Sequence, residues 1–394
     1  MNNFIFYSPT KFIFGKDSEK KVASLAREYG ATKVLLLYGS NSALKSGLLA
    51  RVKRYLEEDK LAYVELGGVK PNPEDDLVYR GIEVVKDFGV DFIVAMGGGS
   101  VIDTAKAIAA GAVYDGDFWD FFAGKSMVKQ ALPVGTILTI SAAGSEASPS
   151  MVITKKSTME KRGHGNDLLR PVFSIMNPML TVTLPKEQTF YGVVDMMAHI
   201  MERYFSYTEE VDLTSQMCEA VLNSIISNTQ ILLESPRDYG ARANIMWAGS
   251  IAHSDILGVG RDQDWGSHGL AHELSSLYGS AHGATLAVVF PAWLRYAVEH
   301  NEDITAIAEF ATNVWAVDYE EEEDLREIAQ KGIVAYLEFL RQLGMPTTLE
   351  ELGGKEEDIP LLAVKAKKRG HYIQLNQENI EKIYNLTLKK NKIV

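Results

Sequence analysis

The stretch Phe92-Ile-Val-Ala-Met-Gly-Gly-Gly-Ser-Val-Ile-Asp103 decides the fold class of this 394-residue chain. Its first five residues form an apolar run of strand length, three glycines follow, and a helix-like segment opens near Ser100. A strand that is apolar on both faces is typical of a parallel sheet covered by helices on each side. The stretch therefore predicts a strand, a tight turn and a helix within an α/β domain.

Similar strand-like and helix-like segments alternate on both sides of this stretch. Such alternation favours a parallel sheet whose strands are linked by helices. A β-hairpin is expected at the start of the chain, where Ser8-Pro9-Thr10 separates two apolar runs. The expected hairpin strands are 4–7 and 11–14, the further strands are 33–38, 61–66, 92–96, 132–140 and 171–183, and the helices are 18–29, 44–58 and 75–88.

The pattern changes after Pro185, where helix-periodic segments follow one another and few segments resemble strands. We therefore expect an α/β domain over residues 1–184 and an all-helical domain over residues 185–394. The expected helices cover residues 186–205, 212–233, 239–256, 266–277, 283–298, 324–343 and 377–389.

Composition excludes several classes of protein. The chain has 40 basic and 52 acidic residues, a formal charge of −12, which argues against nonspecific binding of nucleic acid or anionic membranes. Its single cysteine, Cys218, allows neither an intrachain disulfide nor a thiolate metal cluster. No apolar stretch approaches the roughly 20 residues of a membrane span, and the first residues do not resemble a secretory signal. The cytoplasm is the expected location.

The segment Asp195-Met-Met-Ala-His199 predicts a metal ligand pair. It lies within an apolar, helix-periodic stretch, where an unpaired carboxylate would cost several kcal/mol, so Asp195 needs a cation. Residues four apart lie one turn apart on the same helix face, and Asp195 and His199 can therefore point at one ion.

Three further histidines follow in Trp265-Gly-Ser-His-Gly-Leu-Ala-His272 and in Ser280-Ala-His282-Gly283. His268 and His272 are also one turn apart, and both could bind the same ion. His282 stands at a predicted helix start. The residue pattern alone does not choose among the three imidazoles. His164, His253, His300 and His371 lack such neighbours and are interpreted as surface or packing residues.

The glycine turn Gly97-Gly98-Gly99-Ser100 is a candidate phosphate site. Glycine lets the main chain approach an anion closely, and the first N–H groups of a helix attract negative charge. The pattern differs from the G-x-G-x-x-G fingerprint and from a Walker A motif. Taken alone it also fits an ordinary tight connection between strand and helix.

A second turn, at the end of the first long strand, bears on the choice of nucleotide. An acidic residue at such a strand end can hold the ribose 2′-hydroxyl of NAD, but no Asp or Glu occurs between Val34 and Arg51. Small side chains and Lys45 leave space for a 2′-phosphate, so NADP(H) is favoured over NAD(H). The expected contact residues are Gly39, Ser40, Asn41 and Ser42.

Over nearly its whole length, the chain resembles the iron-containing (group III) alcohol dehydrogenases, and within them the NADP(H)-dependent butanol dehydrogenases. The resemblance rests on Asp195-x-x-x-His199 and on several other motifs. These other motifs are Tyr7-Ser-Pro-Thr-Lys-Phe-Ile-Phe-Gly15, Lys70-Pro-Asn-Pro73, Gly97-Gly-Gly-Ser-Val-Ile-Asp103, Ala143-Gly-Ser-Glu146, Ala241-Arg-Ala-Asn244, His268-x-x-x-His272-Glu-Leu and His282-Gly283.

The resemblance implies a parallel dinucleotide-binding sheet in the first domain and a metal-binding, catalytic helical domain. It implies one divalent metal, Fe²⁺ or Zn²⁺, and leaves His272 as a catalytic residue near the substrate. The implied metal ligands are Asp195, His199, His268 and His282.

The same resemblance places the cofactor. The pyrophosphate is expected on the turn Gly97–Ser100, and Asp103 close to the nicotinamide ribose or the substrate, as a second catalytic residue. The family more often has Thr where this chain has Ala143, so a hydroxyl contact at that position is in doubt. The nicotinamide half is expected to be lined by Thr139, Ser141, Lys161 and Leu180.

The resulting expectation is a metal-dependent alcohol dehydrogenase or aldehyde reductase. It would use NADP(H) and short-to-medium aliphatic aldehydes or alcohols such as butyraldehyde and butanol, and would form a homodimer through the edge strand near the chain start. Two other classes stay open: a metal- and nucleotide-dependent lyase resembling dehydroquinate synthase, and a non-enzymatic nucleotide-sensing or metal-storage protein.

Overall fold

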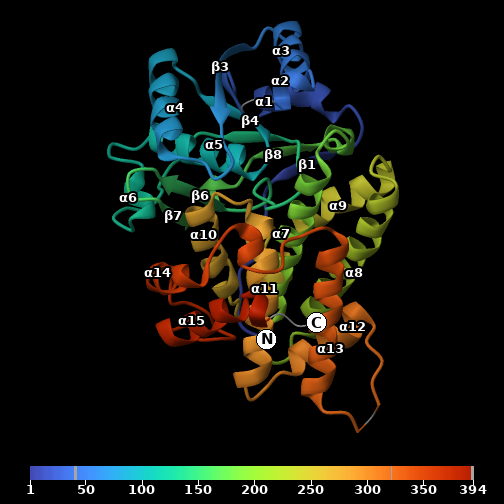
Figure 1. Cartoon of the computed structure of the whole chain (residues 1–394). Coiled ribbons are helices and arrows are strands. Elements are labelled where there is room, and N and C mark those ends of the chain that lie inside the picture. The colour runs from blue at the N-terminus through green and yellow to red at the C-terminus, as the bar shows by residue number, and fades with distance from the viewer. Residues whose placement is uncertain (40–41, 321, 392–394) are drawn as a thin grey trace. The chain divides into compact units, whose positions relative to one another are not determined.

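The computed structural model describes residues 1–39, 42–320 and 322–391. The chain forms two compact units. The sheet unit contains Tyr7–Leu184 together with Pro236–Ser254. The helical unit contains Met1–Phe6, Pro185–Ser235 and the chain from Asp255 onwards. Figure 1 labels the elements of both units.

The core of the sheet unit is a six-stranded sheet in which every pair of neighbours is parallel. This confirms the expected α/β domain with a parallel sheet. In spatial order the strands are β1 (Lys11–Phe14), β8 (Phe173–Met176), β5 (Val134–Leu138), β4 (Phe92–Gly97), β2 (Lys33–Gly39) and β3 (Ala62–Val69).

Both faces of this sheet are buried, which explains why its central strands are apolar throughout. Along β2, Leu35 and Leu37 pack in a core shared with helices α4 and α5, whereas Val34 and Leu36 pack in a core shared with α1 and α3. Successive side chains of a strand point to opposite faces, so the alternation assigns each helix pair to its own face. These helices are α1 (Val22–Glu28), α3 (Leu48–Glu58), α4 (Asp75–Phe88) and α5 (Gly99–Ala112).

The sheet unit also contains an antiparallel hairpin and a helix from later in the chain. The hairpin was not predicted from the sequence. Helix α9, which was expected in the all-helical domain, belongs to the sheet unit, where Ser250 donates to the buried Glu146 at 2.5 Å. The remaining elements here are β6 (Ser150–Lys155), β7 (Glu160–Gly165), α9 (Tyr239–Ala252), α2 (Ser42–Lys45), α6 (Trp119–Phe122), η1 (Ser18–Lys21), η2 (Asp167–Leu169) and η3 (Pro178–Thr181).

The hairpin expected at the chain start is wrong. Residues 4–7 form no strand, and β1 pairs in parallel with β8, with Lys11 N donating to Val172 O at 3.1 Å. Residues 1–6 belong to the helical unit, where Asn2 N donates to Gly260 O at 2.8 Å. A strand needs ladder partners, and β8 supplies them to residues 11–14 while residues 4–7 have none.

The helical unit confirms the expected succession of helices after Pro185 and adds α12 and α14, which were not predicted. Within the described ranges, no helix has both the length and the apolar character required to cross a membrane. The helices are α7 (Lys186–Tyr204), α8 (Asp212–Glu234), α10 (Gly266–Tyr278), α11 (His282–His300), α12 (Thr305–Trp315), α13 (Leu325–Gln342), α14 (Ile359–Lys365) and α15 (Gln377–Leu386), with short turns η4 (Ile256–Gly258), η5 (Glu350–Leu352), η6 (Glu356–Asp358) and η7 (Lys389–Asn391).

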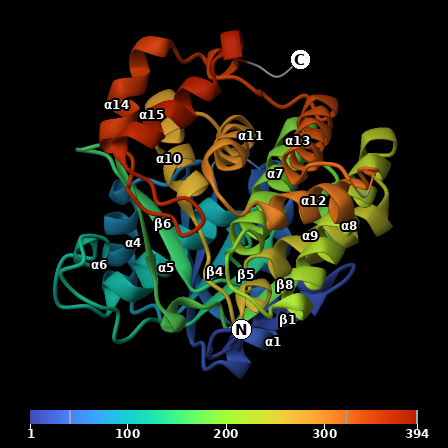
Figure 2. The same cartoon turned by 90° about the horizontal axis from the view of Figure 1, so that it is seen from below.

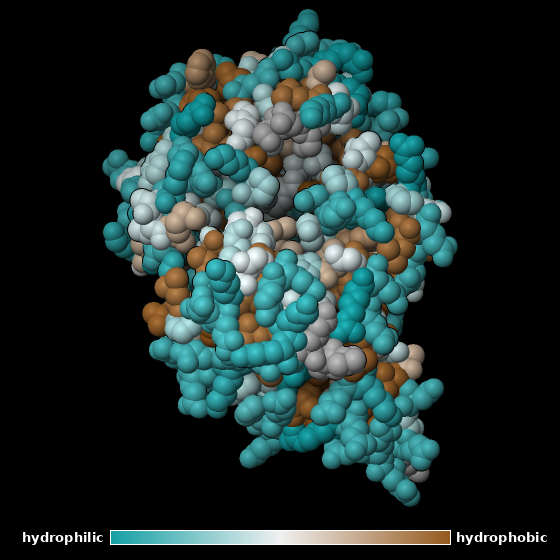
Figure 3. All heavy atoms as spheres, viewed as in Figure 1, coloured by the Kyte–Doolittle hydropathy of each residue, from teal (hydrophilic) through white to brown (hydrophobic). Residues whose placement is uncertain are grey.

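The surface in view in Figure 3 is mostly hydrophilic, with hydrophobic residues in small separate groups. Charged residues make up 23% of the chain, and acidic ones outnumber basic ones. Charged and polar side chains favour water, and the apolar side chains concentrate in the buried cores.

Helices α7 and α11 pack against each other in the helical unit, with α10 beside α11 (Figures 1 and 2). A Cβ added at Gly283 would lie 2.0 Å from the main-chain oxygen of Tyr191. Only glycine permits this approach, because the obstacle is backbone and cannot rotate away. The contact fixes the start of α11 against α7, one turn before Asp195.

We expect Gly283→Ala to destabilise the protein by about 2 kcal/mol, since overpacking against a rigid neighbour typically costs about 1–3 kcal/mol. Melting followed by circular dichroism should show a midpoint lower by roughly 4–8 °C. Gly269→Ala is the matched control: its added Cβ would meet nothing closer than 3.6 Å, and alanine favours a helix. Equal melting temperatures for the two variants would contradict the packing argument.

Candidate metal centre and cofactor turn

Three predicted metal ligands meet within the helical unit. Asp195 on α7, His268 on α10 and His282 at the start of α11 each offer one ligand atom, and these atoms lie within 4.8 Å of one another. Asp195 and His268 are both 4% exposed. A buried carboxylate facing two imidazoles is a donor set that divalent metals prefer. The structure therefore brings together, from three helices, residues far apart in the sequence.

His199 lies one turn after Asp195, as expected from the spacing. Its Nδ1 is 2.8 Å from the main-chain oxygen of Asp195 and 3.6 Å from Oδ1 of the same residue. Its ring centroid is 4.6 Å from that of His268. Because Nδ1 faces a carbonyl oxygen, it carries the proton, and Nε2 carries the lone pair that a metal would use.

Burial holds the pKa of His199 well below its usual value, and the neighbouring His268 and Arg203 add to this shift. A neutral imidazole is the form that binds metal. His199 is therefore in the protonation state that the predicted ligand role requires.

His268 is held by Glu202, a residue that the sequence analysis missed. Nδ1 of His268 is 2.7 Å from Oε1 of Glu202, whose side chain is fully buried on the last turn of α7. This contact assigns the proton to Nδ1 and directs Nε2 toward Asp195 and His282. A signal was available: Glu202 follows His199 by three residues in the same apolar stretch, where an isolated carboxylate would be costly.

His272 lies one turn after His268 and, like His199, it is outside the group of three close ligand atoms. Its ring centroid is 5.0 Å from that of His282, and its side chain is half-buried. This position is compatible with a group that contacts substrate next to the ion. Its assignment as a catalytic residue stays a prediction.

Trp265 forms one wall of the metal centre. Its ring centroid is 5.2 Å from that of His268 and 5.7 Å from that of His199. The Arg203 guanidinium lies over the indole, 4.7 Å from the ring centroid. Trp265 has a φ of 62°, an unusual conformation for a bulky residue, and it ends the segment before α10.

The histidines interpreted as packing or surface residues lie in other surroundings. His164 packs against Phe121 and Phe122 in the sheet unit, and His300 stacks on Tyr296 with centroids 4.0 Å apart. His371 donates its main-chain N–H to Asp264. The contacts of His164 and His300 are those of packing residues, and His371 is exposed.

The donor set fits the cation that the sequence predicts. One carboxylate and two imidazoles, with His199 predicted as a third imidazole, suit Fe²⁺ or Zn²⁺ better than Mg²⁺ or Ca²⁺, which prefer oxygen ligands. Oδ1 of Asp195 is 3.6 Å from Nδ1 of His199 and 3.7 Å from Nε2 of His282, so the carboxylate faces the histidine cluster. The choice between iron and zinc does not follow from these residues.

A pocket of about 570 Å³ borders this cluster within the helical unit. Tyr191, Ala281 and Ala284 line it, so it lies next to the turn that carries His282. Its other walls mix apolar and charged side chains, and these residues are Ser280, Arg341, Gly344, Met345, Pro346, Thr347, Glu351 and Leu352.

The glycine turn lies where β4 ends and α5 begins. Gly98 is the N-cap residue of α5, and the helix starts at Gly99. A Cβ added at Gly97 would lie 2.4 Å from the Val101 side chain, and one added at Gly98 would lie 2.1 Å from Ile140. Packing alone therefore requires glycine here. The same bare backbone at a helix N-terminus also suits a phosphate, and that binding role stays a prediction.

The ends of three neighbouring strands meet at this turn. Gly39 ends β2, Gly97 ends β4, and Thr139 directly follows β5 and donates its main-chain N–H to Gly97 O at 3.0 Å. The carboxyl edge of a parallel sheet, at the point where strand order reverses, is the usual ligand site of such folds. Of the other residues expected here, Ser40 and Asn41 lie outside the described residues, and the side chain of Ser42 is not described.

Asp103 has internal partners at both carboxylate oxygens. Oδ1 accepts from the Ser145 hydroxyl at 2.6 Å, and Oδ2 accepts from Val152 N at 3.0 Å. The fully buried Lys106 donates to Ser145 and to the main-chain oxygen of Ser148. Burial raises the pKa of Asp103, and Lys106 opposes that shift. Asp103 thus anchors the Ser145–Val152 segment to α5, and its predicted role in catalysis stays a prediction.

The remaining predicted cofactor residues lie in the sheet unit. Lys161 on β7 donates to the side-chain oxygen of Asn72 at 2.9 Å, and Asn72 belongs to the Lys70-Pro-Asn-Pro73 motif. Ser141 is buried in the loop after β5, and Leu180 packs against the core beneath α1 and α3.

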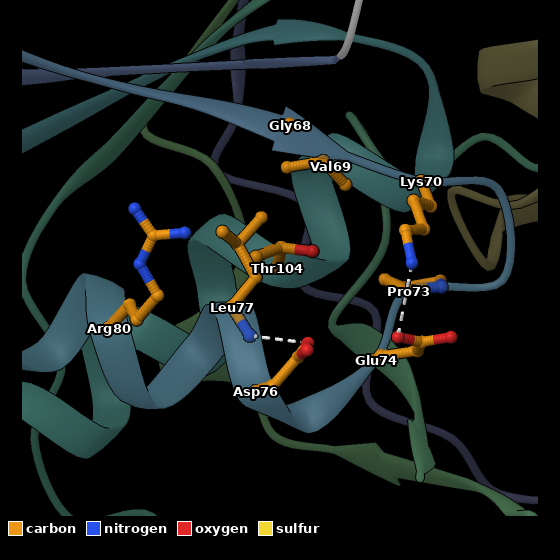
Figure 4. A pocket seen from close by; sticks show the side chains of 9 residues that line it. All are labelled: Gly68, Val69, Lys70, Pro73, Glu74, Asp76, Leu77, Arg80 and Thr104. Carbon is orange, nitrogen blue, oxygen red and sulfur yellow. Dashed lines mark hydrogen bonds and ion pairs between the residues drawn. The ribbon is translucent and has the colours of Figure 1, made fainter.

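A second pocket, of about 150 Å³, lies beside the end of β3 (Figure 4). Leu77 points from α4 toward Val69 and Thr104, and Arg80 lies at the opposite end from Lys70. Lys70 forms a 3.5 Å ion pair with Glu74. Among the described residues, those expected to bind cofactor do not line this pocket.

Models of one protein family match both halves of the chain. A family model described as iron-containing alcohol dehydrogenase matches residues 9–178, and the C-terminal model of the Fe-containing alcohol dehydrogenase family matches residues 189–388.

Individual relatives match over almost the whole chain. The probable NADH-dependent butanol dehydrogenase 2 of Bacillus subtilis is 40% identical over 98% of this chain and 100% of its own length. The NADPH-dependent aldehyde reductase YqhD of Escherichia coli is 34% identical over 94% of each chain. The crystal structure of NADH-dependent butanol dehydrogenase A from Thermotoga maritima has a TM-score of 0.94, 39% identity and 99% coverage of both chains.

We expect Asp195→Asn to weaken binding of a divalent metal more than 100-fold, since losing a direct ligand should exceed the roughly 10–100-fold cost of losing an outer-shell partner. Metal content of the purified variant and chelator competition measure this. His300→Ala, far from the cluster in sequence and stacked on Tyr296, should bind metal like the native chain. Native-like affinity in Asp195→Asn would disprove the ligand assignment.

Proposed function

Since this chain belongs to the iron-containing alcohol dehydrogenase family, and is a metal-dependent alcohol dehydrogenase or aldehyde reductase, we propose that it transfers hydride between NADP(H) and short-to-medium aliphatic aldehydes or alcohols such as butyraldehyde and butanol. The observation that carries this proposal is the cluster of Asp195, His268 and His282, whose ligand atoms lie within 4.8 Å of one another. The names of the relatives support the substrate class.

Four side chains of the helical unit would hold the metal. When bound, the divalent metal supplies a Lewis acid for the carbonyl oxygen, and the nicotinamide supplies the hydride. Asp195, His199, His268 and His282 hold the cation, either Fe²⁺ or Zn²⁺, through one negative and three neutral groups. This donor set leaves the cation a net positive charge for the substrate oxygen.

His272 is the proposed proton carrier. Its half-buried ring lies beside that of His282. An imidazole titrates near neutral pH, so it can pass a proton between the substrate oxygen and solvent.

In the sheet unit, Asp103 is proposed to act near the nicotinamide ribose. It holds Ser145 and the main chain at Val152, which follows the proposed nicotinamide-lining segment containing Thr139 and Ser141. The turn Gly97–Ser100 is the proposed pyrophosphate site, while Lys161 and Leu180 complete the proposed cofactor contacts.

The two alternative classes have less support. A lyase or a non-enzymatic nucleotide-sensing protein would not explain why two alcohol dehydrogenase family models match residues 9–178 and 189–388. Steady oxidation of NADPH on addition of butyraldehyde to metal-loaded protein tests the dehydrogenase directly. The absence of turnover over a series of aldehydes would refute it.

The choice of NADP(H) rests on the end of β2. The relatives divide, because the Bacillus and Thermotoga proteins are named NADH-dependent and the Escherichia protein NADPH-dependent. In this chain Gly39 ends the strand, with no acidic residue from there to Arg51, and Lys45 follows on the exposed side of α2. A 2′-phosphate would meet no negative charge in this segment.

We expect kcat/KM for NADPH to exceed that for NADH by about tenfold or more, a difference of about 1.4 kcal/mol. Gly39→Asp should reverse this preference, since a carboxylate repels the 2′-phosphate and accepts from the 2′-hydroxyl. The side chain has room, because a Cβ at Gly39 would meet nothing closer than 3.6 Å. Gly39→Ala is the control without charge. A native preference for NADH would overturn the choice of NADP(H).

We also propose a homodimer, as the family resemblance implies. Strand β1 is at the edge of the sheet, and edge strands present main-chain groups that can pair with a second chain. Just before it, Phe4, Ile5 and Phe6 have exposed side chains, with Ile5 96% exposed. Consecutive large apolar residues on a surface are typical of a protein contact.

Sedimentation velocity at micromolar protein should therefore give the mass of a dimer. Ile5→Glu should shift the equilibrium toward monomer by placing a charge in the contact, whereas Met127→Glu, at another exposed apolar position, should leave it unchanged. A native chain that sediments only as monomer would exclude the homodimer.

A further inference from the structure

Glu202 is a fully buried carboxylate that ties α7 to the start of α10. It lies on the same helix as Asp195 and His199, but its side chain contacts the neighbouring helix. A charged group with no exposure needs several hydrogen-bond donors to offset its desolvation. The structure supplies four donors, all from Trp265, Ser267 and His268.

The two carboxylate oxygens divide these donors. Oε2 accepts from Trp265 N at 2.7 Å. Oε1 accepts from the Ser267 hydroxyl at 2.6 Å, from His268 N at 3.0 Å and from His268 Nδ1 at 2.7 Å. One carboxylate therefore fixes both the main chain and the imidazole of His268.

We propose that Glu202 is a positioning residue of the metal centre, which sets the orientation and basicity of His268 and so the affinity of the site for its metal. The proposal rests on the proposed metal-dependent function. Glu202 is outside the ligand set that the sequence predicts, and it acts on the metal only through His268.

Two features separate this role from simple helix capping. Trp265 N, Ser267 and His268 N belong to a helix start, and any acceptor there would satisfy them. The Nδ1 contact is different, because a carboxylate on one ring nitrogen makes the other a stronger electron donor and fixes the tautomer. The second feature is its place on the helix of the predicted ligands, where Glu202 follows His199 by three residues.

The contacts of the two carboxylate oxygens predict the effect of each substitution. Glu202→Gln can keep the three contacts at Oε1 but loses the charge, and its amide group would face the N–H of Trp265. Glu202→Asp keeps the charge but withdraws it from His268 by one methylene. Ser267→Ala removes one donor from the same oxygen and leaves the contact with His268 Nδ1 intact.

The test is the dissociation constant of Zn²⁺ or Co²⁺ from the full-length protein, measured by chelator competition without substrate or nucleotide. Glu202→Gln should bind about 10–100-fold more weakly, and Glu202→Asp should be intermediate. The visible spectrum of the Co²⁺ form should shift in Glu202→Gln, because the donor strength of His268 changes. Ser267→Ala should keep native affinity and spectrum.

Glu219→Gln is the matched control on α8 of the same unit. This glutamate accepts from Tyr204 at 2.7 Å and from Asn313 at 2.9 Å, away from the ligands. It should lose stability without any change in metal affinity. A folded Glu202→Gln with native affinity and spectrum would overturn the proposal. If that variant does not fold, native affinity in folded Glu202→Asp would overturn it equally.

Measuring metal affinity also tests the role of Glu202 separately from the proposed dehydrogenase activity. Metal affinity is measured whether or not any aldehyde is reduced. An inactive native protein with a strong, Glu202-dependent metal site would refute the dehydrogenase and support the positioning role. An active enzyme whose metal affinity ignores Glu202 would do the reverse.

Discussion

The helical unit depends on keeping ionisable groups away from water at the meeting of α7, α10 and α11. Asp195, His199, Glu202 and His268 are all buried there, and burial is costly for any charge without a partner. In this core, the Asp195 carboxylate faces imidazoles, and the Glu202 carboxylate accepts from main-chain N–H groups and from an imidazole. The close contact at Gly283 allows this arrangement, because it lets α11 present His282 beside Asp195. The buried ionisable groups and the close glycine contact thus lie on the same few turns of α7, α10 and α11.

In the sheet unit, burial of both sheet faces leaves one edge of the sheet for ligand binding. Its strands are apolar on both faces because helices cover both, and function is left to the carboxyl edge of the sheet. At that edge, glycines allow close packing of strand and helix, and they leave the main-chain N–H groups uncovered by side chains. The buried Lys106 and Asp103 then hold the Ser145–Val152 segment by hydrogen bonds. A polar network of this kind gives a loop one defined position, as a cofactor-lining segment requires.

Much of the fold could be predicted because its signals are local. The apolar run at 92–96 predicts β4, and the periodicity after Pro185 predicts most of the helices within a few residues of their observed ends. The errors occur where partners are distant. The segment 4–7 has strand composition but no strand to pair with, and β1 finds its partner in β8, far along the chain. Helix α9 has ordinary helical periodicity, which cannot tell which unit it joins.

For the metal centre, the sequence by itself determined the candidate ligands. Asp195 and His199 are one turn apart, and an apolar helix cannot hold a carboxylate without a counter-charge. Only the tertiary structure decided that Asp195, His268 and His282 approach within 4.8 Å, that His199 and His272 are outside that group, and that Glu202 holds His268. The reason is physical: helix spacing fixes geometry over one turn, whereas the approach of separate helices depends on packing between residues that the sequence does not place side by side.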